Sequence, residues 1–301
     1  MRCSLPITVL LAAFAVAAAR ADESSFEKKV AADPHGTVEI SNVSGKVTVS
    51  GWDDSEVEVR ATLGAGAQRI DVQSDRGRTS IKVVYPSTSF QGGGTDLQIH
   101  VPRGSELEVT GISAEVRATD VAGPLHLKTV SGAVYAETAQ SDVEVKTVSG
   151  DVTLRGRGGA AGPQLRVQTI SGNIKVEHGS GDLEATTVSG DLTLDLNPTH
   201  NVRIHTTSGE ATLNGKLLKG GTVEAETLSG DLKIHTVAEG ALAYEVNTFS
   251  GDITNCMGAA AEKVSRYGPG MRLSGVQGKE GAGESRVRVK SMSGTVDLCD
   301  H

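Results

Sequence analysis

The chain has 301 residues, of which 37 are acidic and 29 basic, and its formal net charge is −8 at neutral pH. This acidic balance argues against nucleic acid and anionic membranes as partners. Aromatic residues make up only 3% of the chain, whereas 37 residues are glycine. We therefore expect a core of Val, Ile, Leu and Ala arranged in many thin layers.

The N-terminus has the features of a secretory signal peptide. Arg2 precedes an apolar run over residues 5–19, and Ala19-Arg20-Ala21 provides small residues at a cleavage site. The run is shorter than the ~20 residues of a spanning helix, and Cys3 precedes it, which does not suit a lipoprotein anchor. We predict cleavage after Ala21, export to the periplasm, the cell surface or the extracellular space, and a mature chain without a transmembrane segment. Cleavage removes two arginines and leaves 27 basic and 37 acidic residues, a net charge of −10.

Residues 22–123 are predicted to form an N-terminal cap and irregular first coils of a repeat structure. Short alternating, β-branched segments predict strands at 38–40, 47–49, 57–59, 70–72, 81–84, 97–99, 107–109 and 116–118. Ser44-Gly45 is an isolated copy of the Ser-Gly pair that recurs in the repeat described next. Residues 85–95 contain Gly92-Gly93-Gly94 and are expected to form a loop.

Residues 124–301 carry a repeat that occurs eight times. Each copy has an alternating apolar stretch, usually a Thr, one apolar residue, Ser-Gly, usually an acidic residue, and a second alternating stretch. The serines are Ser131, Ser149, Ser171, Ser189, Ser208, Ser229, Ser250 and Ser293. The first seven lie 18, 22, 18, 19, 21 and 21 residues apart. A period of about 20 residues indicates stacked units. We therefore predict an all-β fold, a single-stranded parallel β-solenoid with coils roughly 4.8 Å apart.

Each coil is expected to contain two strands that face the same interior. In the second copy Val143, Val145, Val152 and Leu154 lie on the inward positions. The alternation breaks before the serine, so Thr147 and Val148 would both have to face inward, which requires a bend at Ser149-Gly150. The corner residues of three successive copies are predicted to be structural, as stacked ladders: Thr147, Ser149, Gly150, Thr169, Ser171, Gly172, Thr187, Ser189 and Gly190. Stacked hydroxyls would satisfy backbone groups or one another. The alternative, a flat threonine array that binds ice, requires outward side chains.

Two rows of charged residues run along the predicted stack. Five residues before each serine, the charges largely alternate in sign, which favours the correct register at ~0–1 kcal/mol per pair. Two residues after it stands an acidic strip made of Asp151, Asp191, Glu210, Asp231 and Asp252. We interpret these carboxylates as caps of the turn amides after their own glycine. The alternative is a strip that binds divalent cations or a cationic partner, but the calcium-binding nonapeptide repeat is absent.

The last interval, from Ser250 to Ser293, is about twice the period. Residues 257–283 are rich in glycine and are expected to form a loop inserted into one coil, so that the coils of Ser250 and Ser293 become neighbours. Cys256 and Cys299 each follow their serine by six residues and would stack in register. In an oxidising compartment they are predicted to form a disulfide. Two free thiols, or a bond to another chain, remain the alternatives.

Gly51-Trp52-Asp53, Val101-Pro102 and the recurrent Thr-x-Ser-Gly-Asp give the chain a resemblance to a known family. It resembles the putative adhesin family of bacterial β-strand-repeat proteins, a domain of unknown function, over nearly the whole mature chain. The resemblance implies an exported β-solenoid with a role at the cell envelope or surface. It supplies no catalytic residues.

No group of residues predicts catalysis, a cofactor or a metal site. The eight histidines do not recur at one coil position, and His200 and His205 are interpreted as exposed residues. We predict a monomeric, non-catalytic, adhesin-like scaffold that binds an unknown protein or glycan through repeated contacts along the stack or through residues 85–96 and 257–283. One alternative is a periplasmic envelope-stress or assembly factor. The other is a polysaccharide-active β-helix enzyme, which would use carboxylate pairs ~5–10 Å apart and aromatic platforms that this chain lacks.

Overall fold

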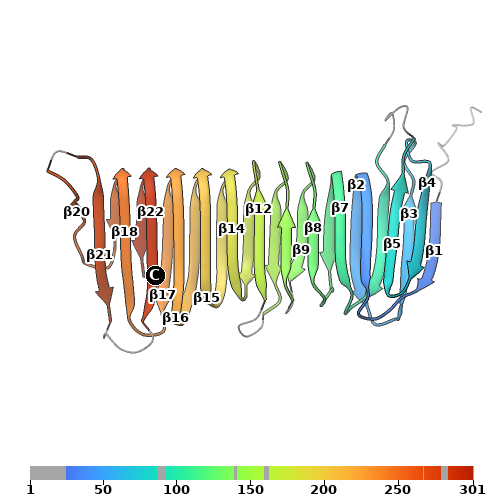
Figure 1. The fold of residues 1–301 in the computed structure, drawn as a ribbon, viewed down its shortest axis with the longest axis horizontal. Helices are drawn as coiled ribbons and strands as arrows, with labels where there is room; N and C mark the ends of the chain where they lie inside the picture. Colours follow the sequence, from blue (N-terminus) through green and yellow to red (C-terminus); the bar gives the residue numbers. More distant parts are fainter. Residues whose placement is uncertain are drawn as a thin grey trace, which may run out of the picture.

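The structure, a computed structural model, describes residues 25–86, 93–138, 141–158, 163–266, 268–278 and 284–300. The predicted signal peptide, residues 1–21, lies outside the described residues. The described chain forms one elongated stack of strands, with its N-terminal part at one end and its C-terminal part at the other (Figure 1).

Every regular element of the described chain is a strand. The strands of the N-terminal part are β1 Ser25–Ala31, β2 Thr37–Trp52, β3 Glu56–Thr62, β4 Arg69–Asp75, β5 Arg78–Val84, β6 Asp96–Pro102 and β7 Glu106–Thr119. The regular stack contains β8 Leu125–Lys128, β9 Val134–Thr138, β10 Val143–Lys146, β11 Val152–Gly156, β12 Gln164–Thr169, β13 Ile174–Gly179, β14 Asp182–Ser189, β15 Leu192–Ser208, β16 Ala211–Ser229 and β17 Leu232–Ala238. The C-terminal part adds β18 Leu242–Ser250, β19 Ile253–Asn255, β20 Glu262–Lys263, β21 Met271–Gln277, β22 Ser285–Ser293 and β23 Val296–Cys299.

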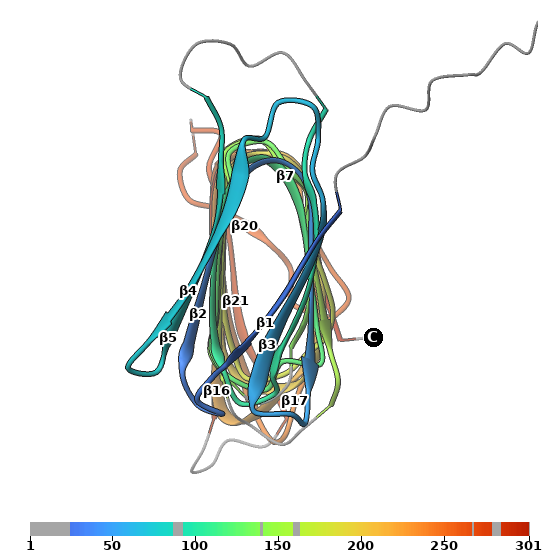
Figure 2. The same cartoon turned by 90° about the vertical axis from the view of Figure 1, so that its right-hand side faces the viewer.

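Each coil of the regular stack is a flattened ring with two faces (Figure 2). One strand lies before the Ser-Gly corner, on what we call the first face, and the next lies after it, on the second face. In one coil these are β10 and β11, and each pairs in parallel with the equivalent strands of the coils before and after it. The corners follow one another along one border of the stack, which we call the Ser-Gly edge and which is uppermost in Figure 1.

The core is a continuous column of aliphatic side chains between the two faces. Val143 and Val145 point into it from β10, and Val152 and Leu154 from β11; all four are at most 2% exposed. The predicted inward positions are therefore confirmed. Because each coil covers the apolar side chains of its neighbours, a single coil could not remain folded alone.

The prediction of a purely parallel solenoid is wrong at the two ends, where the sheet is mixed. At the N-terminal end β1 and β6 both pair antiparallel with β3, and β4 pairs antiparallel with β5. At the C-terminal end β21 pairs antiparallel with β18. Antiparallel strands can follow one another through short turns, so the chain reverses there and ends the stack instead of beginning another coil.

The C-terminal coils do not stack in the order of the sequence. The coil of Ser293, β22 and β23, lies between the coil of Ser229 and the coil of Ser250 (Figure 1). The coils of Ser250 and Ser293 are neighbours, as predicted, but the later coil lies inside the earlier one. The N-terminal end shows the same feature, because β2 lies between β7 on one side and β5 and β6 on the other.

The charge row five residues before each serine agrees with this order. In sequence order Glu224 is followed by Glu245, two like charges. In the structure Arg288 lies between them, opposite Glu224 on one side and Glu245 on the other. The inserted strand thus restores alternation, and the same pairing occurs between Arg166 and Glu184, at 3.0 Å.

Residues 257–283 are not a simple loop. They contain β20 and β21, and β21 covers the free edge of β18 over seven residue pairs. The structure contains the predicted disulfide between Cys256 and Cys299, whose Cα atoms are 4.9 Å apart. It links the outermost coil to the inserted one.

Candidate functional site

The Ser-Gly corner turns one of its two preceding side chains inward and the other outward. Thr147 is 6% exposed, whereas the neighbouring Val148 is 42% exposed. The prediction that both face inward is therefore wrong for the apolar residue. The backbone bend falls between them, so an apolar side chain is left in solvent at the corner of most coils.

These outward residues form a straight line along the Ser-Gly edge, which we call the apolar row. All eight are between 42% and 63% exposed. In stacking order they are Ile112, Val130, Val148, Ile170, Val188, Leu228, Met292 and Phe249. Thr207 takes the place of an aliphatic residue between Val188 and Leu228. Together they expose on the order of a few hundred Å² of apolar surface, a size that marks interaction sites on soluble proteins.

The backbone of the Ser-Gly edge is already hydrogen-bonded from coil to coil. The amide of Ser149 donates to the carbonyl of Val130 at 2.9 Å, and the amide of Ser171 donates to the carbonyl of Val148 at 2.8 Å. A partner therefore cannot add a strand here by main-chain hydrogen bonds. It has to recognise the side chains of the edge.

The inward threonines form a buried ladder, and Ser291 takes this position in the last copy. The Thr147 hydroxyl accepts a hydrogen bond from the Gly150 amide at 3.0 Å, and the Thr206 hydroxyl donates to the Ser208 carbonyl at 3.3 Å. Within the described ranges, no hydrogen-bond partner is found for the hydroxyls of Thr129, Thr169, Thr187, Thr227, Thr248 and Ser291. The prediction that backbone groups or neighbouring hydroxyls satisfy the ladder therefore holds for only part of it. An ice-binding array is excluded because these side chains face the core.

The acidic strip caps backbone amides, but not those of its own turn. A carboxylate oxygen of Asp151 accepts from the Asn173 amide at 2.8 Å, and one of Asp191 accepts from the Glu210 amide at 3.0 Å. Asp231 accepts from the Thr295 amide at 2.7 Å. Each bond joins one coil to the next, so the carboxylates set the register between coils. The prediction that each one caps its own turn is wrong for these three residues.

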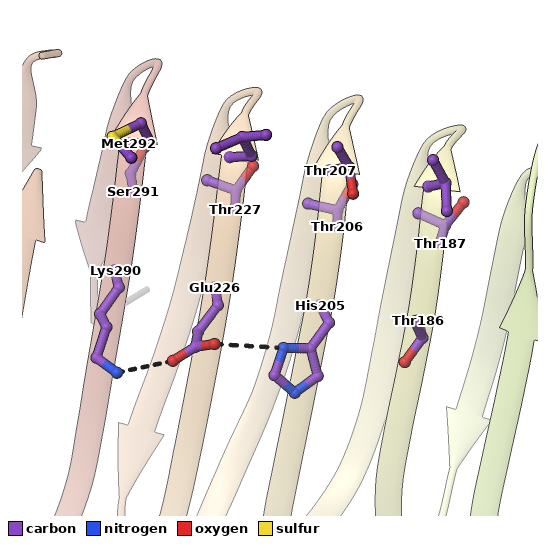
Figure 3. A pocket seen from close by; sticks show the side chains of 12 residues that line it. Thr186, Thr187, His205, Thr206, Thr207, Glu226, Thr227, Lys290, Ser291 and Met292 are labelled. Atoms are coloured by element: carbon purple, nitrogen blue, oxygen red, sulfur yellow. Dashed lines mark hydrogen bonds and ion pairs between the residues drawn. The ribbon is translucent and has the colours of Figure 1, made fainter. Parts of the chain in front are cut away.

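Beside the apolar row lies an open groove of about 610 Å³ that extends over four consecutive coils (Figure 3). Val188, Leu228 and Met292 line it on the side of the row. On the first face Glu226 forms an ion pair with Lys290 at 2.8 Å and approaches His205 Nδ1 at 3.6 Å. The hydrogen bond from Lys290 is the main cause that lowers the pKa of Glu226, so this carboxylate is ionised at neutral pH.

Among the described residues, the groove does not bring together a complete set of catalytic groups. His205 and Glu226 could form a base and its orienting carboxylate, but general acid-base or nucleophilic chemistry also needs a reactive group within hydrogen-bond reach. In the part of the chain that the structure describes, no hydroxyl or thiol is hydrogen-bonded to His205. Glu226 already forms an ion pair with Lys290, and this pair links two neighbouring coils.

A family model named Toastrack DUF4097 matches residues 27–214 and 159–236. The chain belongs to this Toastrack family. Three solved structures are similar to it. They are titled as a putative cell adhesion protein from Clostridium sporogenes ATCC 15579 (9% identity, TM-score 0.22, 92% of this chain and 100% of that one), a putative adhesin from Bacteroides fragilis NCTC 9343 (9%, 0.39, 91% and 97%) and a putative adhesin from Parabacteroides merdae ATCC 43184 (13%, 0.30, 73% and 95%). A search of curated proteins finds no match.

A second polar cluster of this Toastrack protein lies on β2, β3 and β6 at the N-terminal end. Trp52 stacks on His100 with ring centroids 5.2 Å apart, and Lys29 Nζ lies 5.7 Å from the centre of the Trp52 ring. The His100 ring also shares a 2.9 Å hydrogen bond with the Ser50 hydroxyl. Trp52 is half-buried, and its ring already contacts His100 and lies near the Lys29 ammonium, so it is not the free aromatic platform that a carbohydrate enzyme would use.

Beneath this cluster Glu58 is 2% exposed. Lys29 and Arg60 contact the same carboxylate oxygen at 3.1 and 2.8 Å. The hydrogen bond from Lys29 is the main cause that lowers the pKa of Glu58. Strand alternation does not predict this buried ion group, because Glu58 occupies an outward position and is covered by neighbouring strands.

Two further observations bear on metal and membrane binding. Cys256, Cys299 and Asp297 lie close enough to hold an ion, but the two sulfurs are bonded to each other and are not available as thiolate ligands. Among the described residues no helix has the length and apolar character needed to cross a membrane.

Proposed function

We propose that this Toastrack protein is an exported, non-catalytic scaffold that binds a protein or glycan of the cell envelope or surface, in the manner of an adhesin. The observation that carries this proposal is the apolar row. Eight exposed apolar side chains on successive, rigid coils are not explained by core packing, because the core is complete without them. A row of repeated weak contacts suits a long partner surface.

The apolar row is also a better candidate for the binding site than the two irregular segments that the sequence analysis proposed. Residues 87–92, within the segment 85–96, lie outside the described residues. Residues 257–283 contain β21, which covers the edge of β18. Deleting that segment would expose a strand edge and destabilise the stack, so the loss of binding after such a deletion would not identify a contact.

The test combines localisation with variants of the apolar row. Cell fractionation and protease accessibility on intact cells should find the mature protein outside the cytoplasm. A triple variant, Val148→Thr, Ile170→Thr and Val188→Thr, should fold, because Thr207 already occupies this position in one coil, yet it should lose retention in the envelope or surface fraction. Surface exposure supports the adhesin-like role, whereas confinement to the periplasm favours an envelope assembly or stress factor. Cytoplasmic location, or unchanged retention of the variant, contradicts the proposal.

A further inference from the structure

The chemistry of the Ser-Gly edge specifies the kind of partner that the apolar row would accept. The row does not stand alone, because the acidic strip follows it around the corner, three residues further along each coil. Val148 and Asp151 belong to one coil, and Val188 and Asp191 to another. Both rows follow the coils, which lie roughly 4.8 Å apart, so they run side by side along the stack. In stacking order, however, the uncharged Asn173 lies between Asp151 and Asp191, and Thr295 lies between Asp231 and Asp252.

The strip has little positive charge beside it; Lys233 contacts Glu210 and also interacts with Asp231. Asp151, Asp191, Asp231 and Asp252 are all exposed, and none forms an ion pair within the described part of the chain. Only Glu210 does so, with Lys233 at 2.7 Å. The capping hydrogen bonds found for three of these aspartates are each made by one carboxylate oxygen, and the three residues remain exposed. Asp191, Glu210 and Asp231 lie on successive coils, where like charges repel one another, and a partner that brings positive charge would relieve the repulsion.

We propose that the Ser-Gly edge binds a basic amphipathic helix of a protein partner. Its apolar side chains would lie along the apolar row and in the groove between Val188 and Met292, and its Lys or Arg side chains would face the acidic strip. A helical turn advances 5.4 Å, close to the coil spacing, so successive turns can follow successive coils. Because the backbone of the edge is already hydrogen-bonded from coil to coil, the partner has to be recognised by side chains. This inference rests on the proposed function, because it assigns a partner to the same edge.

The same observations disfavour three other occupants. An anionic membrane would meet the acidic strip and a chain of net charge −8. A second copy that packed its edge antiparallel across a two-fold axis would place one acidic strip against the other. A glycan would find only one aromatic side chain, Phe249, in the row.

The experiment uses a labelled synthetic 18-residue helix of Leu and Lys, which spans about 27 Å. Helices of the same length made of Leu and Glu, and of Lys and Gln, are the controls. Fluorescence anisotropy with the full mature protein should show that the Leu/Lys helix binds at least about tenfold more tightly than either control. Its affinity should fall as salt is raised. Equal binding of the Leu/Glu helix would overturn the inference.

Variants that the chain itself shows to be compatible with the fold then map the site. Leu228→Thr with Met292→Thr copies Thr207, and Asp191→Asn with Asp231→Asn copies Asn173, which occupies the same position and keeps a hydrogen-bond acceptor. The first pair should weaken binding about tenfold, and the second should weaken it and reduce its salt dependence. Matched changes away from the edge, Val237→Thr and Asp75→Asn, should leave binding unchanged. If the edge variants bind as well as the unchanged protein, the inference is wrong.

Two further measurements separate the partner's chemistry from the proposed function. Sedimentation of the protein with vesicles of anionic lipid should show no membrane binding. Sedimentation velocity of the protein alone should show no self-association that depends on the apolar row. Membrane binding or such self-association would mean that a membrane or a second copy, and not a helix, occupies the edge. If the helix does not bind but the row variants still lose retention in the envelope fraction, the proposed function stands and only the partner's chemistry fails.

Discussion

The middle of the stack and its two ends are built by different rules. In the middle, neighbours in space are neighbours in sequence, since β10 pairs with β8 before it and β12 after it. At each end a strand pair lies out of order, with β22 and β23 between earlier coils at the C-terminus and β2 enclosed by later strands at the N-terminus. In the middle, the repeat alone determines which coil stacks on which. At the ends, the order of the coils depends on contacts between residues distant in sequence.

The difference has a physical cause. A coil in the middle is fixed by a pattern of about 20 residues that is copied in its neighbours, and nearest-neighbour contacts are sufficient. A terminal coil has an uncovered side, which would expose unpaired backbone groups. Inserting a later coil and adding antiparallel strands covers these sides, but requires the chain to close longer loops.

The largest expected effect comes from removing the covalent link at the C-terminal end. Replacing both cysteines, Cys256→Ser with Cys299→Ser, opens a link across 43 positions, which corresponds to about 4 kcal/mol in the chain-entropy estimate. Native-state hydrogen exchange should show the loss in the amides of β22 and β23 and leave those of β10 and β11 unchanged. A uniform loss along the stack would show that middle and end unfold together.

The close stacking of glycines in the middle gives a second test. Gly209 has φ of 126°, and an added Cβ would lie 2.3 Å from the Gly190 carbonyl oxygen. Gly240 has a similar φ of 121° but meets nothing within 4 Å. Gly209→Ala should therefore destabilise the protein by roughly 2 kcal/mol more than Gly240→Ala, as measured by urea unfolding. Equal losses would mean that backbone conformation alone accounts for the glycine.

A smaller effect is expected from acid at the N-terminal end. The pKa of Glu58 is lowered, chiefly by Lys29, so its contribution to stability is present above the ordinary carboxyl range and is lost as the pH falls through the lowered value. Hydrogen exchange in β1 and β3 should accelerate in this acidic range before exchange in the middle does. Glu58→Gln should remove most of that pH dependence, whereas Glu27→Gln, at an exposed partner of Arg60, should retain it. An unchanged profile in the Glu58 variant would refute this assignment.

The smallest effect concerns the charge row that accompanies the inserted coil. Arg288→Glu would place three glutamates side by side, with Glu224 and Glu245, and should cost about 1 kcal/mol at low salt. Arg286→Glu on the same strand is the control, because its neighbours are the uncharged Thr222 and Ala243. Thermal unfolding at low and high salt should separate the two variants only at low salt. Equal behaviour would mean that the charge row does not help to order the coils.

Several features could be predicted because they repeat. The inward aliphatic positions, the corner at Ser149-Gly150 and the alignment of Cys256 with Cys299 follow from a pattern seen in every copy. The outward turn of Val148 could not be read from alternation, since two adjacent residues break it and either can be the one that faces solvent. The partners of Asp151 and Asp191 were missed because a capping carboxylate can reach its own turn or the next coil, and the sequence is equally compatible with both.

The repeating unit follows from the amino-acid sequence alone, because a period near 20 residues with aliphatic residues at fixed positions can bury its apolar side chains only by stacking. The sequence also contains one indication of the stacking order of the C-terminal coils, because in sequence order the like charges of Glu224 and Glu245 would be neighbours. The positions of the terminal coils, and the side chains that face the solvent along the Ser-Gly edge, are evident only in the folded structure. Those outcomes depend on backbone bends and on contacts between distant segments, and local patterns do not encode either of them.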